Sequence, residues 1–153
     1  MNNEQLQKIA DENYAVPAGK DPEAMIPGLV ELLGSPDQIA RERSMEILGN
    51  WGSVGHFRDE TLRDLGDQMV EGLSYKLGEV DLDSVFRRSY SALVLCTPLG
   101  ADQYFDVGLV EGRAGFLSSE RVQQWCARAV EALRGEDPQN PMASGLGFGG
   151  NNR

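Results

Sequence analysis

Apolar side chains recur at intervals of three and four residues along most of the chain, and this interval places them on one side of an α-helix. Residues 22–34 show the pattern clearly, because Met25, Ile26, Leu29 and Val30 fall on one stripe. Strand signals do not recur in the same way. The sequence therefore predicts an all-α protein with helices at residues 4–13, 22–34, 37–50, 59–77, 85–96 and 120–134.

Residues that favour helix ends lie between these stripes. Asp21 and Pro22 suit the first positions of a helix, and Gly34 suits the position just after its end. Pro98, with its neighbours, predicts the end of the helix over residues 85–96. That helix is apolar on most sides, so we expect it at the centre of the core.

The predicted helices come in pairs. Residues 22–50 and 59–96 each hold two helices, with a period near 40 residues that is typical of HEAT or armadillo-like repeats. Such pairs bury their apolar faces by stacking on their neighbours. We expect an N-terminal helix and loop at residues 1–21, a helical-repeat domain at 22–134, and a Gly/Asn-rich tail at 135–153.

Two consecutive segments carry a resemblance to a known family. Residues 70–79 read VEGLSYKLGE, and residues 83–95 read DSVFRRSYSALVL. This pattern resembles an uncharacterised bacterial family of HEAT-like helical proteins, a domain of unknown function, over residues 22–134. The family usually continues with a segment rich in Gly, Trp and His and a further helix, whereas this chain has its Gly/Asn-rich tail there. The resemblance implies a fold and no activity, and it implies an uncovered apolar flank on the helix at 120–134.

The charge of the chain restricts its partners. It carries 24 acidic and 14 basic side chains, a formal net charge of -10, which repels phosphate backbones. We therefore expect no nucleic-acid partner. No apolar run approaches the roughly 20 residues that span a bilayer, and no secretory signal is visible, so we expect no membrane partner and a cytoplasmic location.

Residue types that commonly hold metals or act as nucleophiles are few. Cys96 and Cys126 lie inside apolar helical patterns, where we expect buried, reduced thiols. His56 is the single histidine and builds no ordinary zinc site. The glycine run at residues 145–150 follows no predicted strand, so a linker is favoured over a phosphate loop. We expect no metal and no cofactor.

The best candidate binding site centres on two adjacent arginines. Asp83 and Arg87 are four residues apart and can pair along one helical face, while Arg88 lies on an adjacent face of an otherwise apolar helix. A guanidinium near a core needs a carboxylate or an anionic ligand. Either a structural ion pair between helices or a site for an anion or acidic peptide fits these residues. Arg41, expected to face water, and Trp51, which either packs in the core or stacks on a ligand, complete the candidate binding residues.

Three functions fit the sequence. The first is a non-enzymatic interaction module that binds a protein or peptide, or a second copy of itself, through the surface of the helical repeats. The second is a small-anion binder or enzyme that uses Asp83, Arg87 and Arg88. The third is an acidic, virus-encoded inhibitor that imitates nucleic acid, which needs carboxylates aligned on one face.

Overall fold

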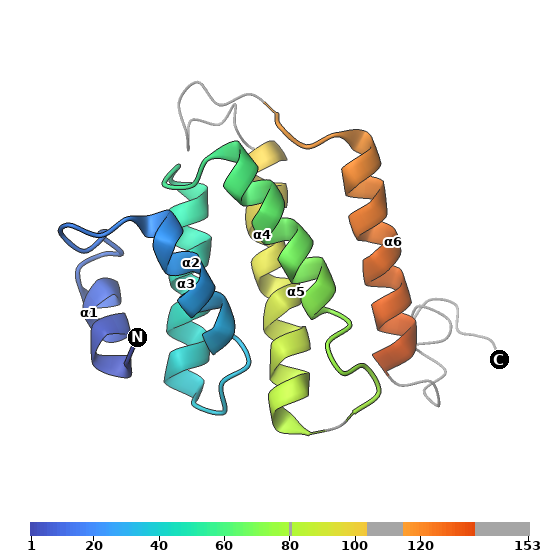
Figure 1. Ribbon diagram of the computed structural model, residues 1–153, viewed down its shortest axis with the longest axis horizontal. Helices are drawn as coiled ribbons and strands as arrows, with labels where there is room; N and C mark the ends of the chain where they lie inside the picture. The colour runs from blue at the N-terminus through green and yellow to red at the C-terminus, as the bar shows by residue number, and fades with distance from the viewer. Residues whose placement is uncertain (80, 104–114, 137–153) are drawn as a thin grey trace.

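The computed structural model describes residues 1–79, 81–103 and 115–136, and these form six α-helices and no strand (Figure 1). The all-α prediction is therefore confirmed. The helices are α1 (Asn3–Asp11), α2 (Pro22–Leu32), α3 (Gln38–Ser53), α4 (Asp59–Gly72), α5 (Leu82–Gln103) and α6 (Ser119–Glu136). The predicted tail at residues 137–153, with its glycine run, lies outside the described residues.

Successive helices alternate between two layers of a stack. In one layer α1 packs beside α3 and α3 packs beside α5, while α2 lies on α3 and α4 lies on α5. The last helix, α6, packs beside α4 and so belongs to the layer of the even-numbered helices. Figure 1 shows α2 and α4 in front of α3 and α5, with α6 at one edge.

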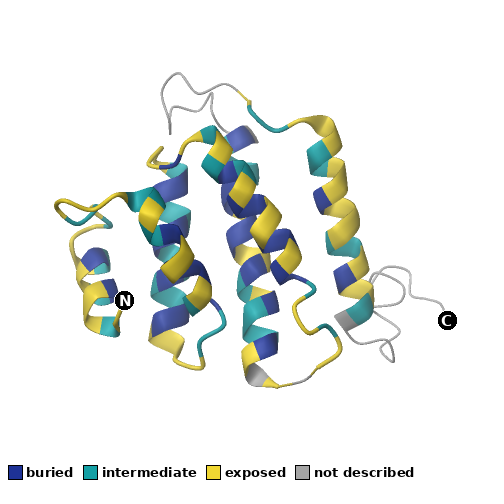
Figure 2. Cartoon of the chain, viewed as in Figure 1, coloured by how far each residue is buried: buried dark blue, intermediate teal, exposed yellow. Residues whose placement is uncertain are grey.

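The core lies between the two layers. Large side chains with no exposed surface come from α3 and α4 above all, including Trp51, Ile47, Leu62 and Leu65. In Figure 2 the buried residues concentrate on α3, α4 and α5, whereas most of α6 is exposed. The stack is therefore well covered in its middle and thinly covered at its α6 end.

The prediction that a helix ends near Pro98 is wrong. Helix α5 continues through Pro98 to Gln103, with Pro98 fully buried. Proline inside a helix removes one backbone hydrogen bond, but burying its ring against the core offsets part of that cost. The extension brings Asp102 to the start of α6, where its Oδ1 accepts hydrogen bonds from the backbone N–H groups of Phe116 (2.7 Å) and Leu117 (2.8 Å).

Helix α4 ends earlier than predicted, at Gly72 instead of near residue 77. Residues 73–78 form turns, and Lys76 and Gly78 have positive φ angles of 46° and 93°. The backbone N–H groups of Ser74 and Tyr75 bond three residues back, to the carbonyls of Glu71 (3.1 Å) and Gly72 (3.2 Å), so the α-helical hydrogen-bond ladder stops here. The carbonyl groups of this turn segment are consequently available to side chains of α5.

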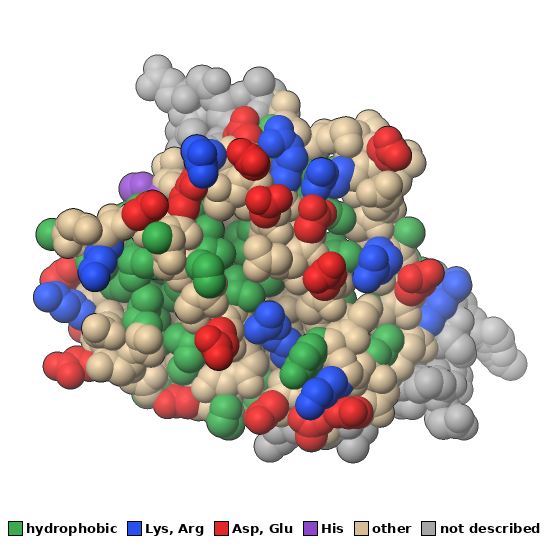
Figure 3. Space-filling model, viewed as in Figure 1, with side chains coloured by type: hydrophobic (Ala, Val, Ile, Leu, Met, Phe, Trp, Pro, Cys, Tyr) green, Lys and Arg blue, Asp and Glu red, His purple; other side chains and the backbone are tan. Residues whose placement is uncertain are grey.

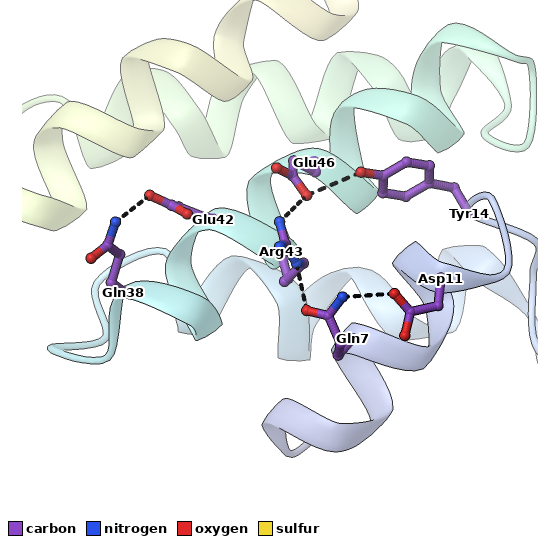
Figure 4. A network of polar contacts seen from close by, with 7 residues as sticks. All are labelled: Gln7, Asp11, Tyr14, Gln38, Glu42, Arg43 and Glu46. Carbon is purple, nitrogen blue, oxygen red and sulfur yellow. Dashed lines mark hydrogen bonds and ion pairs between the residues drawn. The ribbon is translucent and has the colours of Figure 1, made fainter.

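A polar network fastens α1 to α3 (Figure 4). Arg43 donates to Gln7 Oε1 (2.9 Å) and forms an ion pair with Glu46 (2.7 Å), and Tyr14 donates to the same Glu46 oxygen (3.0 Å). Burial of the Tyr14 phenol, together with the neighbouring Glu46 carboxylate, raises its pKa. Leu6 of α1 is also fully buried, so α1 is packed into the stack.

One carboxylate links the first helix pair to the second and gives a pH-dependent prediction. Glu23 in α2 accepts hydrogen bonds from the Arg58 guanidinium (2.8 Å) and from the Arg58 backbone N–H (2.7 Å), and these contacts lower its pKa from 4.5 to about 2. A carboxyl group whose pKa is lower in the folded state stabilises the fold above its unfolded pKa and loses that contribution as pH falls towards the folded pKa.

We therefore expect Glu23→Gln to lower the free energy of unfolding at neutral pH. The difference from wild type should shrink as pH falls from about 4.5 towards about 2. Urea unfolding followed by circular dichroism across this pH range measures the effect. A difference that stays constant across the range would show that the ionised carboxylate of Glu23 contributes nothing.

Candidate functional site

Arg88, one of the two adjacent arginines, is a buried structural side chain. It lies on α5 with 4% of its surface exposed. Its guanidinium donates to the backbone carbonyls of Tyr75 (3.0 Å), Lys76 (3.0 Å) and Glu79 (2.9 Å). Arginine offers five N–H donors in a rigid fork, and here they bind three carbonyls of the turn segment that follows α4. This side chain is therefore committed to the turn after α4.

Arg87 binds a different helix end. Its Nη1 donates to the Val30 carbonyl in the last turn of α2 (2.6 Å). Among the described residues no ion pair joins Arg87 to Asp83, so the expected pairing along the helix face is not formed. Burial lowers the pKa of the half-buried Arg87 guanidinium. A shallow pocket of about 500 Å³ borders it, and Glu31 and Asp83 both line that pocket.

Arg41 and Trp51 are buried as well. The prediction that Arg41 faces water is wrong: 7% of it is exposed, and its Nη1 donates to the carbonyls of Ser35 and Pro36, each at 2.9 Å. Its guanidinium also lies 3.6 Å from the centre of the Phe86 ring, a cation–π contact. Trp51 has no exposed surface and donates from Nε1 to the Tyr14 carbonyl (2.7 Å). Neither side chain presents a surface to a partner.

The three arginines share one role. Arg41 binds the turn between α2 and α3, Arg87 binds the end of α2, and Arg88 binds the turn after α4. Carbonyl groups at the C-terminal end of a helix carry partial negative charge, and a cation beside them is favourable. The arginines consequently hold the turns of the stack in place. They do not gather at one ligand.

One of the two cysteines, Cys96, lies on an exposed surface of α5. The expectation that Cys96 and Cys126 are buried is wrong, because both are free and exposed. Cys96 lies on α5 on the same side as Ser89, Ala92 and Leu93, which are all exposed. These four positions are spaced by three or four residues, so they form one face of the helix. That face holds no charged side chain.

A groove runs between α5 and α6, and it shares Ser89 and Ala92 with this face of α5. We call it the α5–α6 groove; its volume is about 500 Å³, and it is lined by Leu73 of α4, Ser89, Ala92 and Leu95 of α5, and Ala129 and Leu133 of α6. Arg88 also borders the groove, with its guanidinium bound to the backbone carbonyls described above. Leu93 and Leu133 keep 53% and 49% of their surface exposed. Exposed apolar side chains gathered beside one groove are typical of an interaction site.

The far wall of the groove is held in position by contacts between α6 and α4. Trp125 is 3% exposed and donates from Nε1 to Asp67 Oδ1 (2.8 Å), while Arg121 forms an ion pair with the other oxygen of Asp67 (2.6 Å). These contacts join α6 to α4, and within the described residues the side of α6 towards α5 lines the groove. The family resemblance implies an uncovered flank on this helix.

Other kinds of site find no support in the described part of the chain. Among residues 1–79, 81–103 and 115–136, no group of three or more His, Cys, Asp and Glu side chains is placed to hold a metal ion. His56 is exposed, with its ring edge-on to Trp51 at 6.5 Å between centroids. No helix in the same residues has the length and hydropathy needed to cross a membrane. Acidic and basic side chains are intermixed over the face in Figure 3.

Comparison with protein-family models, with curated proteins and with solved structures finds no match to this chain.

Proposed function

We propose that this protein is a non-enzymatic interaction module that binds an α-helix of a protein in the α5–α6 groove. The observation that carries the proposal is the exposed, uncharged face of α5 at residues 89, 92, 93 and 96. A helix of a stack normally buries such a face against the next helix, since each unit is covered by its neighbour. On the described chain no helix covers it, so a protein partner has an apolar surface to bind.

The walls of the groove suit a helix better than an extended peptide. Ser89, Ala92 and Ala129 are small, so the backbone of a bound helix is able to approach α5 and α6 closely. Leu133 lines the groove, and Leu93 follows Ala92 of the groove wall along α5; both are exposed and offer apolar contacts to large side chains of the partner. Helix recognition in grooves relies on apolar residues at positions i, i+3, i+4 and i+7 of the ligand. The HEAT-like character suggested by the sequence is part of this proposal.

Selection from a displayed library of amphipathic helical peptides tests the proposal. We expect selected peptides to carry one apolar stripe and to bind wild type, and we expect Leu93→Glu or Leu133→Glu to weaken them by about 100-fold or more, because a carboxylate would then be buried without a partner. The matched control is Ile39→Glu, since Ile39 is also an apolar helix residue with 48% exposure and lies away from the groove. Peptides that bind Leu133→Glu as well as wild type would refute the groove as the site, because Leu133 lines it.

A second candidate function, a small-anion site at Arg87, rests on one observation. Arg87 borders a pocket of about 500 Å³, and it donates a hydrogen bond to the neutral carbonyl of Val30. Glu31 and Asp83 line the same pocket and repel anions. This arrangement favours a structural role for Arg87. Phosphate titration followed by NMR of the Arg87 side chain distinguishes the structural role from anion binding.

The third function, imitation of nucleic acid, requires aligned carboxylates with few cations among them. Acidic and basic side chains are intermixed on the face drawn in Figure 3. We therefore place this hypothesis last.

A further inference from the structure

We infer that the α5–α6 groove is filled by α6 of a second copy of this chain, in a symmetric dimer; the inference rests on the proposed function of the groove. Its starting point is the stagger at the end of the stack. Helices α3 and α5 belong to one layer, and α4 and α6 belong to the other. Because α6 packs on α4 and the α5–α6 groove separates it from α5, the described residues leave one helix position open beside α5, in the layer opposite α6.

One symmetry operation fills this position in both copies. A two-fold axis parallel to the helices, at the end of the stack, reverses the direction of the stack and exchanges its two layers. It places α6 of the partner beside α5 of the first copy, and α6 of the first copy beside α5 of the partner. The result is one continuous two-layer stack, and closed two-fold dimers of this kind are the commonest form of homo-oligomer.

The chemistry of the surface favours a second copy. Each chain carries a net charge of -10, so two copies repel each other wherever acidic faces meet. The contact proposed here avoids this repulsion, since neither Ser89, Ala92, Leu93 and Cys96 of α5 nor Cys126, Ala129, Val130 and Leu133 of α6 are charged. A two-fold interface must also be self-complementary. The proposed contact meets this requirement because small residues on α5 of each copy face the projecting Leu133 on α6 of the other.

The dimer has a chemical consequence that a monomer lacks. Cys96 and Cys126 are exposed on the single chain and lie on the two helices that meet across the axis. Their thiols become covered on dimerisation. Their rate of alkylation by iodoacetamide should therefore fall as the protein concentration rises.

Sedimentation velocity on the full chain, over a wide range of concentrations, tests the inference. We expect wild type and Ile39→Glu to approach twice the chain mass of 16.7 kDa. We expect Leu93→Glu and Leu133→Glu to raise the dimer dissociation constant by about 100-fold or more, since each buries a charge at the contact. Both leucines are exposed in the monomer, so circular dichroism should show unchanged helix content.

Two outcomes would overturn the inference: a wild-type monomer at every concentration, or a dimer that both glutamate variants leave intact. The peptide selection separates these failures from failure of the proposed function. A monomer whose groove binds helical peptides retains the proposed function and loses the second copy as occupant. A monomer whose groove binds no peptide loses both.

Discussion

Replacing Arg88 with methionine is expected to lower the free energy of unfolding by about 3 kcal/mol. Hydrogen bonds to a charged group contribute about 1.5–3 kcal/mol each, but the carbonyls of the exposed turn residues can bind water in the variant, which offsets part of the loss. Arg88 serves the carbonyls of Tyr75, Lys76 and Glu79, and methionine fills a similar volume without any donor. Urea unfolding measures the loss. Hydrogen exchange should also show faster exchange in the turn over residues 73–79.

The neighbouring arginine provides a matched control. Arg87→Met removes a hydrogen bond to the Val30 carbonyl, which also accepts a hydrogen bond from the Leu33 N–H (3.2 Å). We expect a loss of about 1 kcal/mol for this variant, because the carbonyl keeps a partner. Equal losses for Arg87→Met and Arg88→Met would contradict the special role of Arg88 in the turn.

The position of Arg88 was partly visible in the sequence. Arg88 is spaced by three, four and seven residues from Val85, Ala92 and Leu95, which are all apolar. The spacing alone therefore indicates that this guanidinium points inward. Its acceptors have no such signal, because every residue carries a carbonyl group and only the fold decides which ones a guanidinium reaches.

Arg41 illustrates the same limit on α3. Arg41 precedes Ser44 by three residues and Leu48 by seven, and both of these are buried. The helical spacing therefore places Arg41 on the buried face of α3. An exposed Arg41 was predicted because charged side chains are rarely buried without a partner. The partners are two carbonyls of the preceding turn and the ring of Phe86, which the sequence alone does not bring together.

Helix α5 shows how a correct pattern leads to a wrong environment. Its apolar residues on most sides predict a helix at the centre of the core, and the prediction that Cys96 is buried agrees with it. In the structure Val94 and Leu95 are buried, while Leu93 and Cys96 are exposed. Hydrophobicity shows that a face is suited to burial, but it does not show whether the same chain covers it. The α5–α6 groove is an example: its walls are largely apolar, and no helix among the described residues covers it.

Replacing Gly66 with alanine is expected to destabilise the protein by about 1–3 kcal/mol, the usual cost of forcing an extra group into a packed interface. In most helices the same change stabilises by up to about 1 kcal/mol, because alanine has the better helix propensity. Gly66 reverses the sign because a Cβ there would overlap the six-membered ring of Trp125, the main anchor of α6 on α4. Urea unfolding gives the loss, and tryptophan fluorescence reports displacement of Trp125.

Gly49 in α3 is the matched control for this prediction. A Cβ at Gly49 would meet Thr97 Oγ1 at 3.7 Å, an ordinary contact, so Gly49→Ala should stabilise the fold by about 0.5–1 kcal/mol. A double-mutant cycle isolates the cause: once Trp125→Leu has removed the indole, Gly66→Ala should no longer destabilise, giving a coupling energy of about 1 kcal/mol or more. If Gly66→Ala costs the same with and without the indole, then α6 does not pack on α4 through Trp125, and the outer wall of the groove lies elsewhere.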